Sequence, residues 1–157
     1  MSRKQITRQK RQLILDPKHK DILLSRFIRK VMMSGKLSLA QRIVYQALDL
    51  LEERTKEPGH EVALKALENV KPLVRVKARR VGGSTYQVPM EVSEELGWSF
   101  AMRWVIDASR KKSGKDFAHC LADELGEAYE KRGDAFRKRE ETHRMADANR
   151  AYAHFRA

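Results

Sequence analysis

Cysteine is nearly absent from this chain of 157 residues, because Cys120 is the only one. A single thiol excludes an intrachain disulfide and is typical of a reducing compartment. No apolar run approaches the roughly 20 residues that span a membrane. The basic start, residues 1–12, is not followed by an apolar stretch of signal-peptide length. We therefore expect a single domain with its own core, which stays in the compartment where it is made and has no membrane partner.

The residue patterns of enzymes and metal sites are also missing. The five histidines lack metal-ligand spacing, and there is no Cys-x-x-Cys pair. His119 and Cys120 are adjacent on an expected helix, so their side chains point in different directions. Gly82-Gly83 belongs to no phosphate-binding motif, and Glu52-Glu53 lies among basic residues as solvated helix charge. We expect no catalytic site, metal, cofactor or small-molecule substrate.

What the sequence has is positive charge, +12 in total, and it is unevenly distributed. Residues 1–20 carry +6, and residues 71–92 and 131–157 carry +4 each. Residues 21–70 carry only +1, and residues 93–130 carry −3. Such patches on a nearly neutral body favour a polyanionic partner, of which nucleic acid is the commonest. The alternatives are a merely solvated surface or a membrane surface, but no patch has the aromatic amphipathic face that membrane binding uses.

The first half of the chain divides into an arm and helices. Residues 1–20 predict a flexible, extended basic arm, which ends at the turn signal Asp16-Pro17. Residues 21–70 have the three- and four-residue spacing of helices. Helices are expected at 22–34, at 38–54 with Ser38 as its cap, and at 62–70.

Residues 73–92 alternate with a period of two and predict a β-hairpin. A two-residue Gly82-Gly83 loop would mix apolar and charged residues on each face. A three-residue loop ending at Ser84 would pair Val76 with Met90, Ala78 with Val88 and Arg75 with Glu91. We chose the three-residue register because it leaves one face almost wholly apolar.

Helical spacing resumes over 93–150, with Asp116 as a candidate cap, and 151–157 forms a tail. Phe100 and Trp104 fall on the apolar face, whereas Trp98 and Tyr86 are less clearly inward and could stack on bases. The expected fold is mainly α, a bundle of about six helices with one protruding hairpin, in a single RNA-binding domain over 1–157.

The polar face of the hairpin would place Arg75, Lys77 and Arg79 at roughly 7 Å steps, suited to the phosphates of an extended strand. The alternative is an edge strand protected from aggregation by charge. The polar helix that begins at Arg137 has a thin packing face of its own and would gain stability from phosphates. The candidate RNA contacts are Arg3, Lys4, Arg8, Lys10, Arg11, Lys30, Lys36, Lys71, Arg75, Lys77, Arg79, Arg110, Lys111, Lys112, Lys115, Arg137, Lys138, Arg139 and Arg144.

Five stretches resemble the small-subunit ribosomal protein seven family. They are AQRIVY at 40–45, ALENVKP at 66–72, VKARRVGGSTYQVP at 76–89, KREETHRMA at 138–146 and NRAYAHF at 149–155. The third stretch is the most specific, and the last two resemble the bacterial type of ending. The segments 1–16 and 94–98 depart from the family pattern, which leaves their individual RNA contacts in doubt.

The resemblance implies a structural protein of the small ribosomal subunit that binds the 3′ major domain of its ribosomal RNA and nucleates assembly of the head. It places the hairpin near the exit-site transfer RNA and the messenger RNA path, at Arg79, Arg80, Gly82, Gly83, Ser84 and Tyr86. Small-subunit ribosomal proteins nine and eleven are the implied protein partners. The implied location is the cytoplasmic ribosome, or an organelle if the copy is organelle-encoded. The rival is a DNA-binding or nucleoid protein, but Asp49, Glu52 and Glu53 make the second helix of the best helix-turn-helix candidate acidic.

Overall fold

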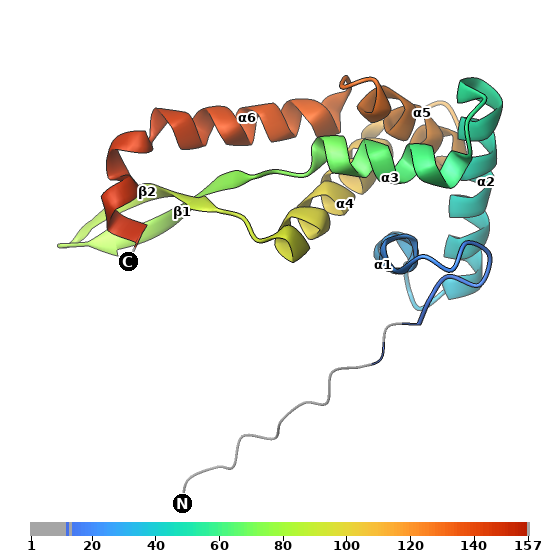
Figure 1. Cartoon of the computed structure of the whole chain (residues 1–157), viewed down its shortest axis with the longest axis horizontal. Coiled ribbons are helices and arrows are strands. Elements are labelled where there is room, and N and C mark those ends of the chain that lie inside the picture. Colours follow the sequence, from blue (N-terminus) through green and yellow to red (C-terminus); the bar gives the residue numbers. More distant parts are fainter. Residues whose placement is uncertain (1–11, 13, 157) are drawn as a thin grey trace, which may run out of the picture.

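The computed structural model describes residue 12 and residues 14–156. Within them, five helices form a body from which a two-stranded antiparallel hairpin projects, while α6 runs alongside the hairpin (Figure 1). The mainly α fold with one hairpin is therefore confirmed. The elements are α1 (Ile22–Val31), α2 (Leu37–Thr55), α3 (Gly59–Val70), β1 (Val74–Val81), β2 (Ser84–Glu91), α4 (Glu94–Lys111), α5 (Phe117–Tyr129), α6 (Asp134–Ala148) and the 3₁₀-helix η1 (Arg150–Arg156).

Polar caps start three of the helices. The Asp116 side chain accepts a hydrogen bond from the His119 N–H, which confirms the cap expected for α5. Ser38 is wrong as a cap, because α2 already begins at Leu37 and no side chain caps it. The reason is an earlier turn: Ser34 and Gly35 both have positive φ, so α1 ends at Val31 and the chain reverses before Ser38.

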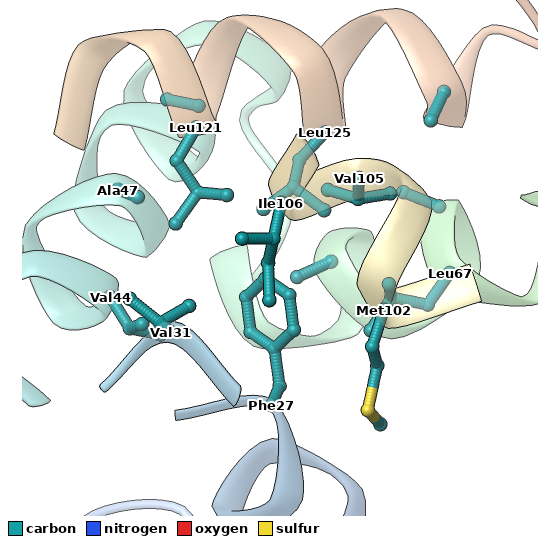
Figure 2. Close-up of a cluster of buried hydrophobic side chains, with 14 of the residues drawn as sticks. Phe27, Val31, Val44, Ala47, Leu67, Met102, Val105, Ile106, Leu121 and Leu125 are labelled. Carbon is teal, nitrogen blue, oxygen red and sulfur yellow. The ribbon is translucent and has the colours of Figure 1, made fainter. Parts of the chain in front are cut away.

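The core lies where α1 to α5 meet (Figure 2). Phe27 of α1 is fully buried, and around it lie Val44 of α2, Met102 and Ile106 of α4 and Leu125 of α5. Burying an aliphatic or aromatic side chain of this size contributes roughly 1.5–3 kcal/mol. This core holds α1 and α4 side by side, and the surface between these two helices is a basic groove.

The hairpin has the register that we rejected. Val76 pairs with Pro89 and Arg79 with Tyr86, so the loop is the two-residue Gly82-Gly83 turn. Both glycines have positive φ, as a type I′ turn requires, and this turn matches the twist of the strands. The backbone preference of the Gly82-Gly83 turn thus determined the register, although this register mixes apolar and charged residues on each face. Pro89 also fits, because alternation from the turn puts it in a pair that needs no N–H.

The end of the expected arm belongs to the folded body. Asp16 is 1% exposed and accepts a hydrogen bond from the Tyr45 hydroxyl at 2.5 Å. Its other oxygen accepts from the His19 N–H, and the Ile14 carbonyl accepts from the Ser25 hydroxyl. The Asp16-Pro17 turn is confirmed, but residues 14–20 are fixed by backbone and side-chain hydrogen bonds, not free as part of the arm.

Polar groups attach α6 to the base of the hairpin. The Leu73 N–H donates to His143 Nε2 at 3.0 Å, and Arg139 Nε donates to the Lys71 carbonyl at 3.3 Å. Burial lowers the pKa of His143, and the nearby Arg139 guanidinium lowers it further. A neutral imidazole with a bare Nε2 is therefore the form that holds the hairpin to α6.

The expected tail, 151–157, is mostly the helix η1, which folds back onto β2 (Figure 1). Arg79 Nη1 donates to the carbonyls of Phe155 and Arg156 at 2.9 and 2.8 Å. The Tyr86 ring lies 5.2 Å from Tyr152 and 5.1 Å from Phe155, centre to centre. We call these contacts the hairpin clasp.

Candidate nucleic-acid interface

The four basic residues of β1 do not share one role. Arg79 is occupied by the hairpin clasp, and Arg75 lies over the Phe100 ring at 5.4 Å. Lys77 and Arg80 are exposed and make no ion pair with any residue that the structure describes. Alternation puts them on opposite faces of the strand. Among the described residues, the hairpin therefore presents on each face one exposed cation without a protein partner, where the sequence predicted a row of three on one face.

Tyr86 is half-buried against η1, so its ring packs within the protein. Gly82, Gly83 and Ser84 form the exposed tip of the hairpin. None of the three has a large side chain, and the exposed Arg80 lies close to them on β1.

The basic residues of α6 are mostly paired. Arg137 lies 3.1 Å from Asp134 and Lys138 lies 3.7 Å from Glu141, both as exposed pairs one turn apart on the helix. Exposed pairs of this kind contribute little to stability and can re-pair with phosphates. Arg139 is less exposed and anchors the hairpin base, whereas Arg144 is exposed without an ion pair among the described residues.

The basic run at the end of α4, residues 110–112, also contains both paired and unpaired residues. Lys112 forms ion pairs with Glu127 at 3.0 Å and with the fully buried Glu124 at 3.2 Å. Burial alone would lower the pKa of Lys112, but its contacts with Glu127 and Glu124 outweigh burial and raise it. Lys112 is thus part of the fold, while Lys111 is exposed and has no ion pair within the described ranges.

Lys115 is more exposed than Lys112 but also has a partner, Asp123 at 2.9 Å. Burial would raise the pKa of Asp123, yet hydrogen bonds from Lys115 and Arg54 outweigh burial and lower it. Lys71 lies 4.7 Å from the centre of the Trp98 ring and 3.7 Å from Glu94, with 17% of its side chain exposed. Lys71 and Lys115 therefore both form contacts within the protein.

A basic groove between two helices was only partly predicted. Two adjoining hollows of about 500 and 150 Å³ lie between α1 and α4 and share Lys30. We call them the α1–α4 groove. Its cations come from helices about 70 residues apart in the chain, and only two of them were predicted, Lys30 and Arg110; the full set is Arg26, Arg29, Lys30, Arg103 and Arg110.

Two carboxylates lie in the α1–α4 groove beside the five cations. Glu95 is paired with Arg26 at 3.4 Å, and Asp107 lies by the smaller hollow. The groove is therefore net positive and has low-dielectric walls, an arrangement that concentrates the field on an anion. The signal that could have found it was the i, i+3 and i+4 spacing of Arg26, Arg29 and Lys30 on the polar face of α1.

The remaining predicted contacts are divided between the described and undescribed parts of the chain. Lys36 is exposed at the edge of an apolar hollow between α1, α2 and α5. Arg3, Lys4, Arg8, Lys10 and Arg11 lie outside the described residues. Within the described part, no cluster of three His, Cys, Asp or Glu is arranged to hold a metal ion, and no helix is long and apolar enough to cross a membrane.

Comparison with known proteins identifies the family. Residues 2–150 match the family described as ribosomal protein S7p/S5e. Small ribosomal subunit protein uS7 of Acaryochloris marina is 54% identical over 156 residues, covering 99% of this chain and 99% of that protein. The protein of the same name from Petrotoga mobilis is 53% identical over 150 residues, covering 96% and 97%. The chain belongs to the ribosomal protein S7p/S5e family.

Membership confirms the resemblance read from the sequence. Proteins of the S7p/S5e family are structural, non-enzymatic ribosomal components, so the chain is a ribosomal RNA-binding protein and not an enzyme. A third relative, small ribosomal subunit protein uS7 of Hydrogenovibrio crunogenus, is 53% identical and covers 94% of both chains. The α1–α4 groove and the tip of the hairpin are thus surfaces of a ribosomal protein.

Proposed function

We propose that the chain binds the 3′ major domain of small-subunit ribosomal RNA and nucleates assembly of the head of the subunit. The observation that carries this proposal is the α1–α4 groove, where five cations from two packed helices face solvent around shared hollows. A rigid groove of this kind can clamp the phosphates of more than one RNA helix, because the core beneath fixes the spacing of its cations. Specificity then comes from the shape of a folded RNA junction.

The hairpin serves a second contact in this proposal. Its exposed tip and Arg80 reach the path of messenger RNA and the exit-site transfer RNA, which bind only transiently. Small-subunit ribosomal proteins nine and eleven are the protein neighbours, and the cytoplasmic ribosome, or that of an organelle, is the location. These statements rest on family membership, with the projection of the hairpin from the body as support.

The rival function is binding of duplex DNA by α1 and α2. On the structure, Asp49, Glu52 and Glu53 are exposed late in α2, and they would repel the phosphates on either side of a major groove. The α1–α4 groove uses α1 differently, with α4 as its other wall. The two functions therefore predict different preferred ligands for the same protein.

Filter binding of a 3′ major domain RNA fragment across a salt series tests the proposal. We expect preference over a 5′ domain fragment and over duplex DNA, with a slope that reflects roughly 8–10 phosphate contacts. The double variant Lys30→Gln, Arg103→Gln should lower the slope by about two contacts. Lys65→Gln is the matched control, because Lys65 is an exposed α3 lysine outside the groove and the hairpin. A flat salt series, or tighter binding of duplex DNA, would refute the proposal.

A further inference from the structure

The larger hollow of the α1–α4 groove differs from a simple phosphate site. Its volume of about 500 Å³ lies within the range of small-ligand sites, roughly 300–1,000 Å³. Its lining combines cations of α1 with apolar residues of α4: Leu96, Trp98 and Met102. A phosphate backbone alone would leave this apolar part of the hollow without a contact. The hollow is therefore built for a ligand that has both an anionic part and a flat apolar part.

We propose that this hollow binds one unstacked nucleotide of the RNA, with its base against Trp98 and its phosphates on Arg29 and Lys30. A nucleotide is the ligand class that joins a flat π-face to an anion: the cations favour it over an apolar peptide, and the indole of Trp98 favours it over an acidic peptide. Aromatic side chains and cationic grooves are the usual means by which proteins bind unpaired bases. The inference rests on the proposed RNA-binding function and adds a base contact to it.

The neighbours of Trp98 hold its ring in place. The Lys71 ammonium lies 4.7 Å from the centre of the ring, and Trp98 also packs against the core. Gly97 makes room for Lys71, since a Cβ at Gly97 would lie 2.8 Å from Lys71 Cγ. Lys71 in turn pairs with Glu94 at 3.7 Å. An indole fixed in this way offers a base a surface that needs little further ordering.

The charges of the hollow also suit a nucleotide. Three cations line it, Arg26, Arg29 and Lys30, against one carboxylate, Glu95. Glu95 pairs with Arg26 at 3.4 Å, so Arg29 and Lys30 remain for the phosphates on either side of the base. Ser93 and Ser99 also line the hollow, and the Ser93 hydroxyl, which accepts the Leu96 N–H as the cap of α4, still has a proton to donate to a polar edge of the base or the sugar.

Trp98 fluorescence provides the test, because the chain has only one other tryptophan, Trp104. In full-length protein carrying Trp104→Phe, a 3′ major domain RNA fragment should quench and shift the Trp98 emission. Heparin, a polyanion without bases, should leave the emission unchanged at saturation. An unchanged emission upon tight RNA binding overturns the nucleotide site while leaving the RNA-binding function intact. Loss of all RNA binding would instead contradict the proposed function.

Affinity measurements give a second, independent readout. Trp98→Ala should weaken RNA binding about tenfold, within the range for one stacked base, with the salt slope unchanged. Trp98→Phe should restore most of that affinity, and Lys30→Gln should lower the slope by about one. If Trp98→Ala binds as tightly as the unaltered protein, or if it only changes the slope, the base contact does not exist.

Discussion

The link between α6 and the hairpin should be sensitive to pH through His143. Nε2 of this histidine accepts the Leu73 N–H at 3.0 Å, so the imidazole must be neutral there. Protonation puts a hydrogen on Nε2, and the two donors then face each other. Arg139 lies nearby and opposes the added charge, while Glu140 and Asp147 favour it.

The sign of the effect follows from the lowered pKa of His143. Burial, and then Arg139, bring this pKa below its ordinary value of 6.5 in the folded state, so the unfolded chain binds the proton more tightly. The contribution to stability is complete above the unfolded value and is lost as the pH falls below it and through the folded pKa. One hydrogen bond contributes roughly 0.5–1.5 kcal/mol. Leu73 is 61% exposed, so water replaces the lost partner in part, and the lower half of that range applies.

Acidification from about pH 7.5 to about pH 5.5 should therefore lower the Tm by roughly 2 °C through this contact. The protection factor of the Leu73 amide, which is its exchange rate corrected for the slower intrinsic exchange at lower pH, should decrease over the same interval, and this local readout is the more sensitive one. His143→Gln keeps an acceptor without a titrating group and should remove that decrease in protection. His19→Gln is the control for a second histidine, whose pKa is lowered by burial and by His60. A protection factor at Leu73 that decreases equally in His143→Gln would refute the reasoning.

Three further predictions follow from the contacts of charged residues. Lys77→Glu should weaken RNA binding with little change in Tm. Arg79→Glu should also release η1, which would be visible as increased solvent exposure of Tyr86. If both variants expose Tyr86 equally, Arg79 does not hold η1 as assigned here. Glu124→Leu should cost about 2–4 kcal/mol in chemical denaturation, because it removes the acceptor of the buried Ala135 N–H at 2.9 Å and one of the two ion-pair partners of Lys112, which keeps Glu127. Lys138→Leu, which removes an exposed pair, is the control and should change stability by less than about 1 kcal/mol. Removal of residues 1–11 should leave the Tm unchanged, since the hydrogen bonds that fix this segment to the body begin at Ile14. It should lower both the RNA affinity and the salt slope. A large loss of stability with an unchanged slope would rule out a role of residues 1–11 in RNA binding.

The helices were predictable because their apolar spacing reports directly on the core. Apolar residues at three- and four-residue spacing, such as Phe27 and Val31 in α1 and Leu121 and Leu125 in α5, are buried. The boundary at Ser38 failed because a positive-φ turn at Ser34 and Gly35 is a backbone property, and a cap residue three positions after Gly35 looks equally good in sequence. Local spacing thus predicts which face of a helix is buried better than it predicts where the helix begins.

The hairpin register failed for a related reason. The choice assumed that one face would be apolar and the other basic, as in a sheet with one side on a core. Instead η1 packs on Tyr86 on the face that also carries Arg79, and arginine can lie there because two carbonyls of η1 accept hydrogen bonds from its guanidinium. Nothing in residues 73–92 reveals that partner, since it comes from the other end of the chain. Arg103 was missed for the same reason, because the α1 residues with which it lines the α1–α4 groove lie far from it in the sequence.

The hairpin clasp also affects how the hairpin can bind. An isolated two-stranded hairpin is marginal in water, so its cations would have to be ordered when RNA binds. Here α6 lies along the hairpin, His143 and Arg139 hold its base, and η1 closes on Tyr86 and Arg79. Ordering therefore takes place when the protein folds, and in the proposed function Lys77 and Arg80 meet RNA from fixed backbone positions. Because a preorganised contact loses less entropy on binding, two exposed cations on this hairpin can contribute more to affinity than a longer basic row on a free one.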